Sequence, residues 1–133
     1  MRTRSLLLSM LTVVAMACGT AAPDDGDEPL RASGRAGLLG FELSFDAPPA
    51  VGALDGEIVV TRDGAPVTGA DVWVAAHMAS HTHGASEVRA EEAGGGRYRV
   101  TGLDASMAGE WQVEIDAVTP DGEDDAVFEV YVE

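Results

Sequence analysis

The chain has 133 residues, in which 23 Asp and Glu outweigh 8 Lys and Arg to give a formal net charge of −15 at pH 7. This acidic balance argues against nucleic acid and anionic lipid head groups as partners, because both would repel the surface carboxylates. A chain of this length has room for about one small domain with a single core.

The first residues have the pattern of an export signal. Arg2 and Arg4 precede an apolar stretch, Leu6–Ala17, that is too short for a permanent membrane span. Small residues stand directly before Cys18, the single cysteine, and resemble the cleavage and lipidation signal of bacterial lipoproteins. We therefore expect residues 1–17 to be a signal peptide and lipidated Cys18 to anchor the protein to a bacterial membrane, facing the periplasm or the cell surface. The alternative is a cysteine that merely lies near an ordinary cleavage site.

Residues 18–37 are expected to form a flexible acidic linker. They are rich in Ala, Gly, Pro, Asp and Glu and contain the charge run Asp24–Glu28. Such a composition buries too little apolar surface to order itself. The globular domain is then expected over residues 38–133.

This domain is predicted to be all-β. Short runs with alternating or continuous apolar residues are separated by turn signals such as Arg62–Ala65 and Pro120–Gly122. Seven strands are predicted, at 41–45, 57–61, 71–76, 86–91, 97–100, 111–116 and 127–132. Seven short strands with turns between them favour an immunoglobulin-like β-sandwich.

The same pattern predicts which side chains are buried. The third strand, 71–76, is mostly apolar and is expected to be central and covered on both faces. A group of acids near the last two strands is expected to form a solvated face and loop: Asp116, Asp121, Glu123, Asp124 and Asp125. The expected core consists of Leu43, Phe45, Ile58, Val60, Val72, Val74, Val88, Tyr98, Val100, Leu103, Trp111, Val113, Ile115, Phe128 and Val130.

All three histidines lie in one short run after the third strand, together with a methionine. His77, Met78, His81 and His83 follow one another there. In an immunoglobulin-like sandwich the third and sixth strands are antiparallel neighbours, which would bring this loop next to the loop that carries Met107. Imidazole and thioether ligands suit copper, and thioether sulfur favours Cu(I). We therefore predict a copper site of Met78, His81, His83 and Met107, with His77 as a further candidate.

Other interpretations of these residues stay open. Met78 could be a core residue, Met107 could fill its own loop, and the His81–His83 pair could be an exposed polar turn. Zinc is an alternative metal, although it would leave methionine unused. An enzyme is not expected, because the cysteine is predicted to be lipidated and the chain has no Gly-x-Ser-x-Gly motif.

The domain resembles the YtkA-like family, which is related to FixH-like proteins and broadly similar to copper-resistance domains of the CopC type. The resemblance extends over about residues 41–132. It implies an exported or membrane-attached β-sandwich, with relatives linked to copper handling or cytochrome oxidase assembly. On the family pattern Met78, His81, His83 and Met107 would be ligands, whereas Gly109 and Trp111 would be structural. The motifs that carry the resemblance are Gly64–Val72, His77–Gly84, Gly96–Tyr98 and Met107–Val113.

Two functions from different classes follow. The first is a membrane-anchored lipoprotein that binds copper for storage or for delivery to a copper-accepting envelope protein. The second is a metal-free interaction or scaffold module of the cell envelope. Substitution of the His and Met residues would abolish the first function and leave the second intact.

Overall fold

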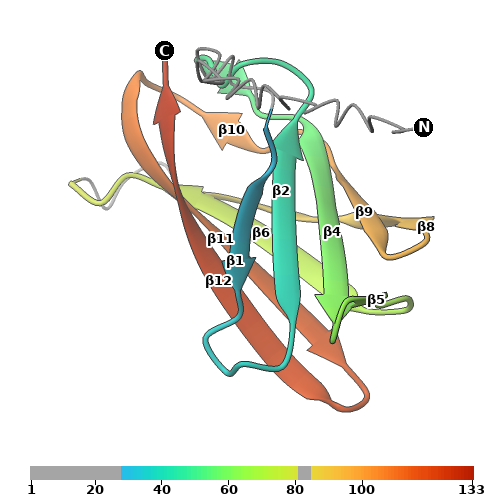
Figure 1. The fold of residues 1–133 in the computed structure, drawn as a ribbon. Helices are drawn as coiled ribbons and strands as arrows, with labels where there is room; N and C mark the ends of the chain where they lie inside the picture. The colour runs from blue at the N-terminus through green and yellow to red at the C-terminus, as the bar shows by residue number, and fades with distance from the viewer. Residues whose placement is uncertain (1–27, 81–84) are drawn as a thin grey trace, which may run out of the picture.

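The computed structural model describes residues 28–80 and 85–133, and all regular structure within them is β. Two antiparallel sheets pack face to face, with a small two-stranded sheet at one end (Figure 1). The larger sheet runs β1-β2-β4-β9-β8, with β5 beside β4; its strands are Leu30–Ser33 (β1), Gly40–Phe45 (β2), Gly56–Arg62 (β4), Ala65–Pro66 (β5), Glu91–Gly94 (β8) and Arg97–Val100 (β9).

The second sheet runs β12-β11-β6-β7 and has the longest strands. Its members are Asp71–His77 (β6), Ser86–Arg89 (β7), Gly109–Thr119 (β11) and Gly122–Val132 (β12). The small sheet pairs Gly52–Ala53 (β3) with Asp104–Ala105 (β10). The expected all-β, immunoglobulin-like sandwich is confirmed, although the described residues form twelve strands rather than seven.

Two turns explain why neighbouring strands pair as they do. Asp63 and Gly64 have φ values of 50° and 79°, as a two-residue hairpin turn between β4 and β5 requires. Pro120 and Asp121 join β11 to β12, and the register Thr119↔Gly122 continues without a shift to Gly109↔Val132. This uninterrupted pairing makes both strands eleven residues long, well beyond the predicted ranges.

The predicted strand 86–91 is in fact divided between the two sheets. Its first part is β7, which pairs with β6, whereas β8 begins at Glu91 and pairs with β9. Ala90 lies between them, is buried, and donates its N–H to the carbonyl of Val72 at 2.9 Å. The chain therefore crosses from one sheet to the other at Ala90.

The ordered sandwich begins before residue 38. Leu30–Ser33, which was expected to belong to the linker, forms β1 and pairs along its length with β2, from Leu30↔Leu43 to Ser33↔Gly40. Most of this strand is solvent-exposed, so its own side chains give little sign of burial.

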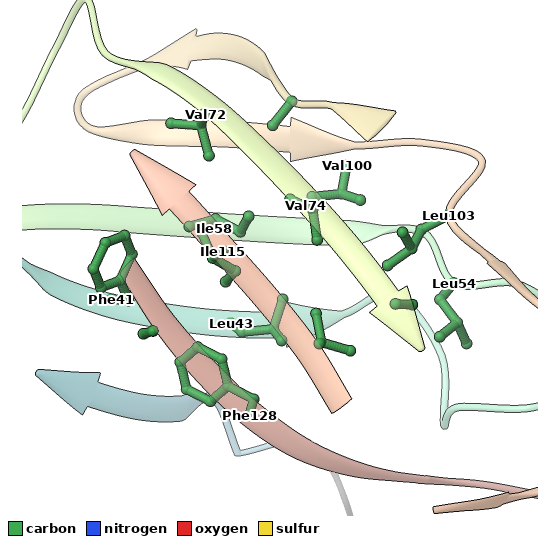
Figure 2. Close-up of a cluster of buried hydrophobic side chains, with 14 of the residues drawn as sticks. Phe41, Leu43, Leu54, Ile58, Val72, Val74, Val100, Leu103, Ile115 and Phe128 are labelled. Atoms are coloured by element: carbon green, nitrogen blue, oxygen red, sulfur yellow. The ribbon is translucent and has the colours of Figure 1, made fainter. Parts of the chain in front are cut away.

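Side chains from both large sheets meet in one core (Figure 2). Phe41 and Leu43 from β2 face Ile115 from β11 and Phe128 from β12. Of the expected core residues, Phe45 and Val88 are only partly buried and pack against its rim. Buried residues that were not expected are Leu39, Phe41, Leu54, Ala76, Ala90, Ala105, Ala117, Ala126 and Val132.

Strand β6 is central in its sheet but is covered on one face, not two. Val72, Val74 and Ala76 point into the core with no exposed surface, whereas Trp73 on the opposite face is 38 % exposed. The outer face of the four-stranded sheet therefore remains open to solvent among the described residues.

Asp124 does not belong to a solvated face and loop, as the sequence predicted, because it is only 3 % exposed. Its carboxylate accepts hydrogen bonds from the backbone N–H groups of Ala36, Leu38 and Leu39 at 2.6–2.9 Å. A Cβ at Gly34 would collide with this carboxylate. Burial alone would raise the pKa of Asp124, but the backbone N–H donors lower it below its usual value. Asp124 thus ties the segment after β1 to β12.

Tyr98 provides a second polar anchor inside the sandwich. Its ring is fully buried, its hydroxyl donates to the carbonyl of Val67 at 2.8 Å, and it accepts from the N–H of Ala70 at 3.0 Å. The two bonds fix the chain between β5 and β6. Burial raises the pKa of this phenol.

Within the described residues no helix is long and apolar enough to cross a membrane.

Candidate metal-binding end of the sandwich

The pairing of β6 with β11 places the two candidate loops at the same end of the sandwich. The strands are antiparallel, with Gln112 opposite His77. Strand β6 ends at His77, and β11 begins at Gly109. The predicted adjacency of these two strands is confirmed, so the chain after β6 and the chain before β11 start from neighbouring positions.

Met78 turns toward the core and reaches the start of β11. It is partly buried and packs against the core residues. Gly109 has φ +132°, and a Cβ built there would lie 3.0 Å from the Met78 Cε. The methyl end of the Met78 side chain therefore lies against Gly109, two residues from Met107 in the chain.

Met107 is held by its backbone and leaves its side chain accessible. Its carbonyl accepts a hydrogen bond from the indole N–H of Trp111 at 2.9 Å, and Trp111 itself is 2 % exposed. Met107 is 48 % exposed. The buried Trp111 thus fixes the backbone at Met107, whereas the Met107 residue itself stays accessible to solvent.

His77 lies on the outer face of the sheet, opposite to the side toward which Met78 packs. Its Nε2 is 3.1 Å from the Gln112 Oε1. An amide oxygen only accepts hydrogen bonds, so the neutral tautomer that fits this contact carries its proton on Nε2 and would keep the Nδ1 lone pair for a metal. The hydrogen bond therefore leaves His77 one ligand nitrogen, on the outer face.

The remaining predicted site residues lie outside the described residues: His81, His83 and Cys18. The sequence adds one point about the methionines. Of the five in the chain, Met1, Met10 and Met16 belong to the expected signal peptide. The methionines and histidines that would remain after cleavage are therefore confined in the sequence to residues 77–83 and to Met107.

An acidic cluster lies on the outer face, and two of its members, Asp116 and Asp125, belong to the acidic group that the sequence predicted to be solvated. Glu114, Asp116 and Asp125 each offer a carboxylate oxygen, and these atoms lie within 4.8 Å of one another. Arg35 pairs with Glu114 at 3.3 Å and also with Asp125. Burial, together with repulsion from Glu114 and Asp125, raises the pKa of Asp116.

The cluster follows from strand geometry. Glu114 and Asp116 are two apart on β11 and so share one face, while the hairpin register sets Asp116 opposite Asp125. Alternation and the turn at residues 120–121 could have predicted this grouping. Since a guanidinium already balances part of its charge, the cluster is an ion-pair network rather than an open carboxylate site.

The protein is a small β-sandwich whose β6–β11 end carries the thioether groups of Met78 and Met107 and the imidazole group of His77. The YtkA-like family matches residues 38–116, which is more than half of the chain. The chain belongs to the YtkA-like family.

Comparison with other proteins adds little beyond the family. No curated protein matches the chain. Among solved structures, the chain is similar to the PKD domain from human VPS10 domain-containing receptor SorCS2, with 16% sequence identity over 98% of this chain and 96% of that one, and a TM-score of 0.38. The strand pairing described above, rather than this likeness, defines the fold.

Proposed function

We propose that this protein is an exported lipoprotein that binds copper at the β6–β11 end of its sandwich and stores it or delivers it to an envelope protein. The observation that carries the proposal is the position of Met78, whose methyl end lies against Gly109 at the start of β11, near Met107. Thioether sulfur is a ligand chosen by Cu(I) rather than by magnesium, calcium or zinc.

The proposed ligand set is Met78 and Met107 with His81 and His83. His77 is a further candidate through Nδ1, in which case its bond to Gln112 would orient the ring. Methionine needs no deprotonation before it binds, so the site would keep its sulfur ligands in an acidic compartment. The role is one of binding and transfer, not of catalysis.

A competition titration tests the metal assignment. The protein, expressed from its full sequence and purified in detergent, is titrated with Cu(I) against a chromogenic chelator, beside the Met78→Leu/Met107→Leu variant. Leucine keeps the apolar volume of methionine, so packing is disturbed little. We expect one Cu(I) per chain in the parent and at least tenfold weaker binding in the variant.

The matched control is Glu114→Gln, which removes charge from the acidic cluster and leaves both thioethers in place. Its Cu(I) affinity should equal that of the parent. Equal binding by the parent and the double methionine variant would reject the copper site and favour the second function, a metal-free interaction module of the envelope.

The anchor is tested separately. We propose that acyl chains on Cys18 hold the protein at the membrane, since each buried methylene contributes about 0.8 kcal/mol. Once residues 1–17 have been removed, the Cys18→Ser chain should appear in the supernatant rather than in the membrane fraction after cell disruption. Retention of this variant in the membrane fraction would contradict lipidation at Cys18.

A further inference from the structure

The two large sheets leave an opening along one side of the sandwich, between β1 and β12. These edge strands lie side by side (Figure 1) but do not pair with each other. The backbone N–H of Arg35 donates to the backbone carbonyl of Asp125 at 2.8 Å, and this bond closes one end of the opening. At the other end Glu133 bonds to Pro49 and Val51, each at 3.0 Å. We call the space between these closures the lateral groove.

The lateral groove is a hollow of about 380 Å³ that both apolar and polar residues line. Leu30, Phe45 and Pro49 line it from the side of the larger sheet, and Val130 and Tyr131 line it from β12. Tyr131 is 64 % exposed, and Leu30 is 38 % exposed. Large apolar side chains left open at the edge of a sheet are typical of a surface that a partner covers.

The edge of β12 also presents a row of backbone groups. The carbonyl of Asp125 and both backbone groups of Glu133 point away from β11, as their bonds to other segments require. Backbone groups alternate in direction along a strand, and the β11–β12 register has no shift, so Val127, Glu129 and Tyr131 point the same way. Among the described residues, none of these three has a backbone partner on that side.

The charged residues that line the lateral groove indicate what kind of partner it would bind. Glu28 and Glu129 are the charged residues that line the groove. Glu28 pairs with Arg31 at 3.5 Å, whereas Glu129 has no ion pair within the described part of the chain. With a net charge of −15, a second copy of this chain would be repelled, and a cationic segment would be attracted.

We propose that the lateral groove binds an extended, cationic segment of a partner protein, which adds to β12 as an antiparallel or parallel edge strand. Backbone bonds to Val127, Glu129 and Tyr131 supply the pairing. Side chains of the added strand alternate, so one set packs on Val130 and Phe45 while the other set lies beside Glu129 and Tyr131. Arginine or lysine suits the second set, through an ion pair and contact with the tyrosine ring.

The test uses a seven-residue probe, the acetylated and amidated peptide Arg-Val-Arg-Val-Arg-Val-Arg, and backbone amide exchange measured by NMR on the protein purified in detergent. The peptide should slow exchange of the Val127, Glu129 and Tyr131 amides at least tenfold. The neighbouring amides of Phe128 and Val130 point to β11 and should change little. A matched peptide with proline in place of the central valine should give much weaker protection.

Two variants separate strand addition from simple charge attraction. Glu129→Pro removes the outward N–H at an edge position that proline tolerates, and should abolish binding of the probe. Glu129→Gln keeps that N–H and should retain binding, weakened severalfold. Tyr131→Ala leaves the backbone bonds intact and should also weaken binding of the probe severalfold. This variant tests the site even if Glu129→Pro alters the fold.

Three results would overturn the proposal. The first is a bound peptide that perturbs the outer face of the β12-β11-β6-β7 sheet and leaves the three amides unprotected. The second is protection of those amides before any peptide is added, since the groove would then already be filled. The third is protection that appears only as protein concentration rises, which would mean that a second copy is the occupant.

Discussion

Replacement of Asp124 should be among the most damaging single substitutions in the sandwich. Its carboxylate accepts N–H groups from Ala36, Leu38, Leu39 and Asp125, at 2.6–3.0 Å. Hydrogen bonds to a charged group contribute about 1.5–3 kcal/mol each, and the contributions of neighbouring bonds do not simply add. Asp124→Ala also leaves buried N–H donors without a partner. We expect a loss of about 3–4 kcal/mol, a large part of the ~5–15 kcal/mol typical of a domain.

Urea unfolding followed by tryptophan fluorescence would measure this loss, because Trp111 is buried in the core. The expected fall in melting temperature is roughly 15–25 °C for a domain of this size. The control is Asp121→Ala, which removes an exposed acid of the next turn that pairs with Arg62 at 2.7 Å. An exposed pair contributes only about 0–1 kcal/mol. Similar losses for the two variants would refute the reasoning.

The pH dependence gives an independent check of the same residue. Burial opposes ionisation of Asp124, but its backbone donors hold the folded pKa below the ordinary value of 3.8. A carboxyl with a lowered folded pKa stabilises the protein above its unfolded pKa, and this contribution is lost as the pH falls through the folded pKa. The stability difference between the parent and Asp124→Asn should therefore be constant near neutrality and shrink in acid. A difference that grows on acidification would contradict the assignment.

Three further substitutions test other parts of the structure. Asp116→Asn should stabilise the protein at pH 7, because burial and the neighbouring carboxylates raise the folded pKa of Asp116. This gain in stability should vanish below the unfolded pKa, which is about 3.9. Urea titrations at several pH values would measure it. Tyr98→Phe removes two buried hydrogen bonds and should cost about 1–2 kcal/mol in urea unfolding, without a change in m value. Gly109→Ala should lower the stability by about 1–3 kcal/mol in thermal unfolding, because its φ is +132° and the new Cβ would press on Met78. A neutral result would place the Met78 methyl group elsewhere.

The alternation of apolar residues was sufficient to predict the central strands. Phe41–Phe45, for example, reads as a half-buried strand because its apolar residues fall on one face. Strand β1 could not be recognised in the same way, since it is four residues long, mostly exposed and separated from an acidic run only by Pro29. It is ordered by its pairing with β2, and that pairing is not visible in the composition of the segment itself.

Two other differences have the same origin. The sequence does not distinguish Asp124 from its acidic neighbours, because its burial depends on the chain around Ala36 closing over it. Ala90 looks like a small residue within one strand, yet the chain changes sheets there. For the candidate site, the topology rule correctly placed the end of β6 beside the start of β11. It could not predict that His77 and Met78 would face opposite sides of the sheet.

X-ray absorption spectroscopy of the Cu(I)-loaded protein tests most directly whether sulfur from Met78 and Met107 binds copper. The proposal predicts two sulfur neighbours together with nitrogen from histidine, and the loss of one sulfur neighbour in each of the single variants Met78→Leu and Met107→Leu. A shell of nitrogen and oxygen alone, unchanged in both variants, would contradict it.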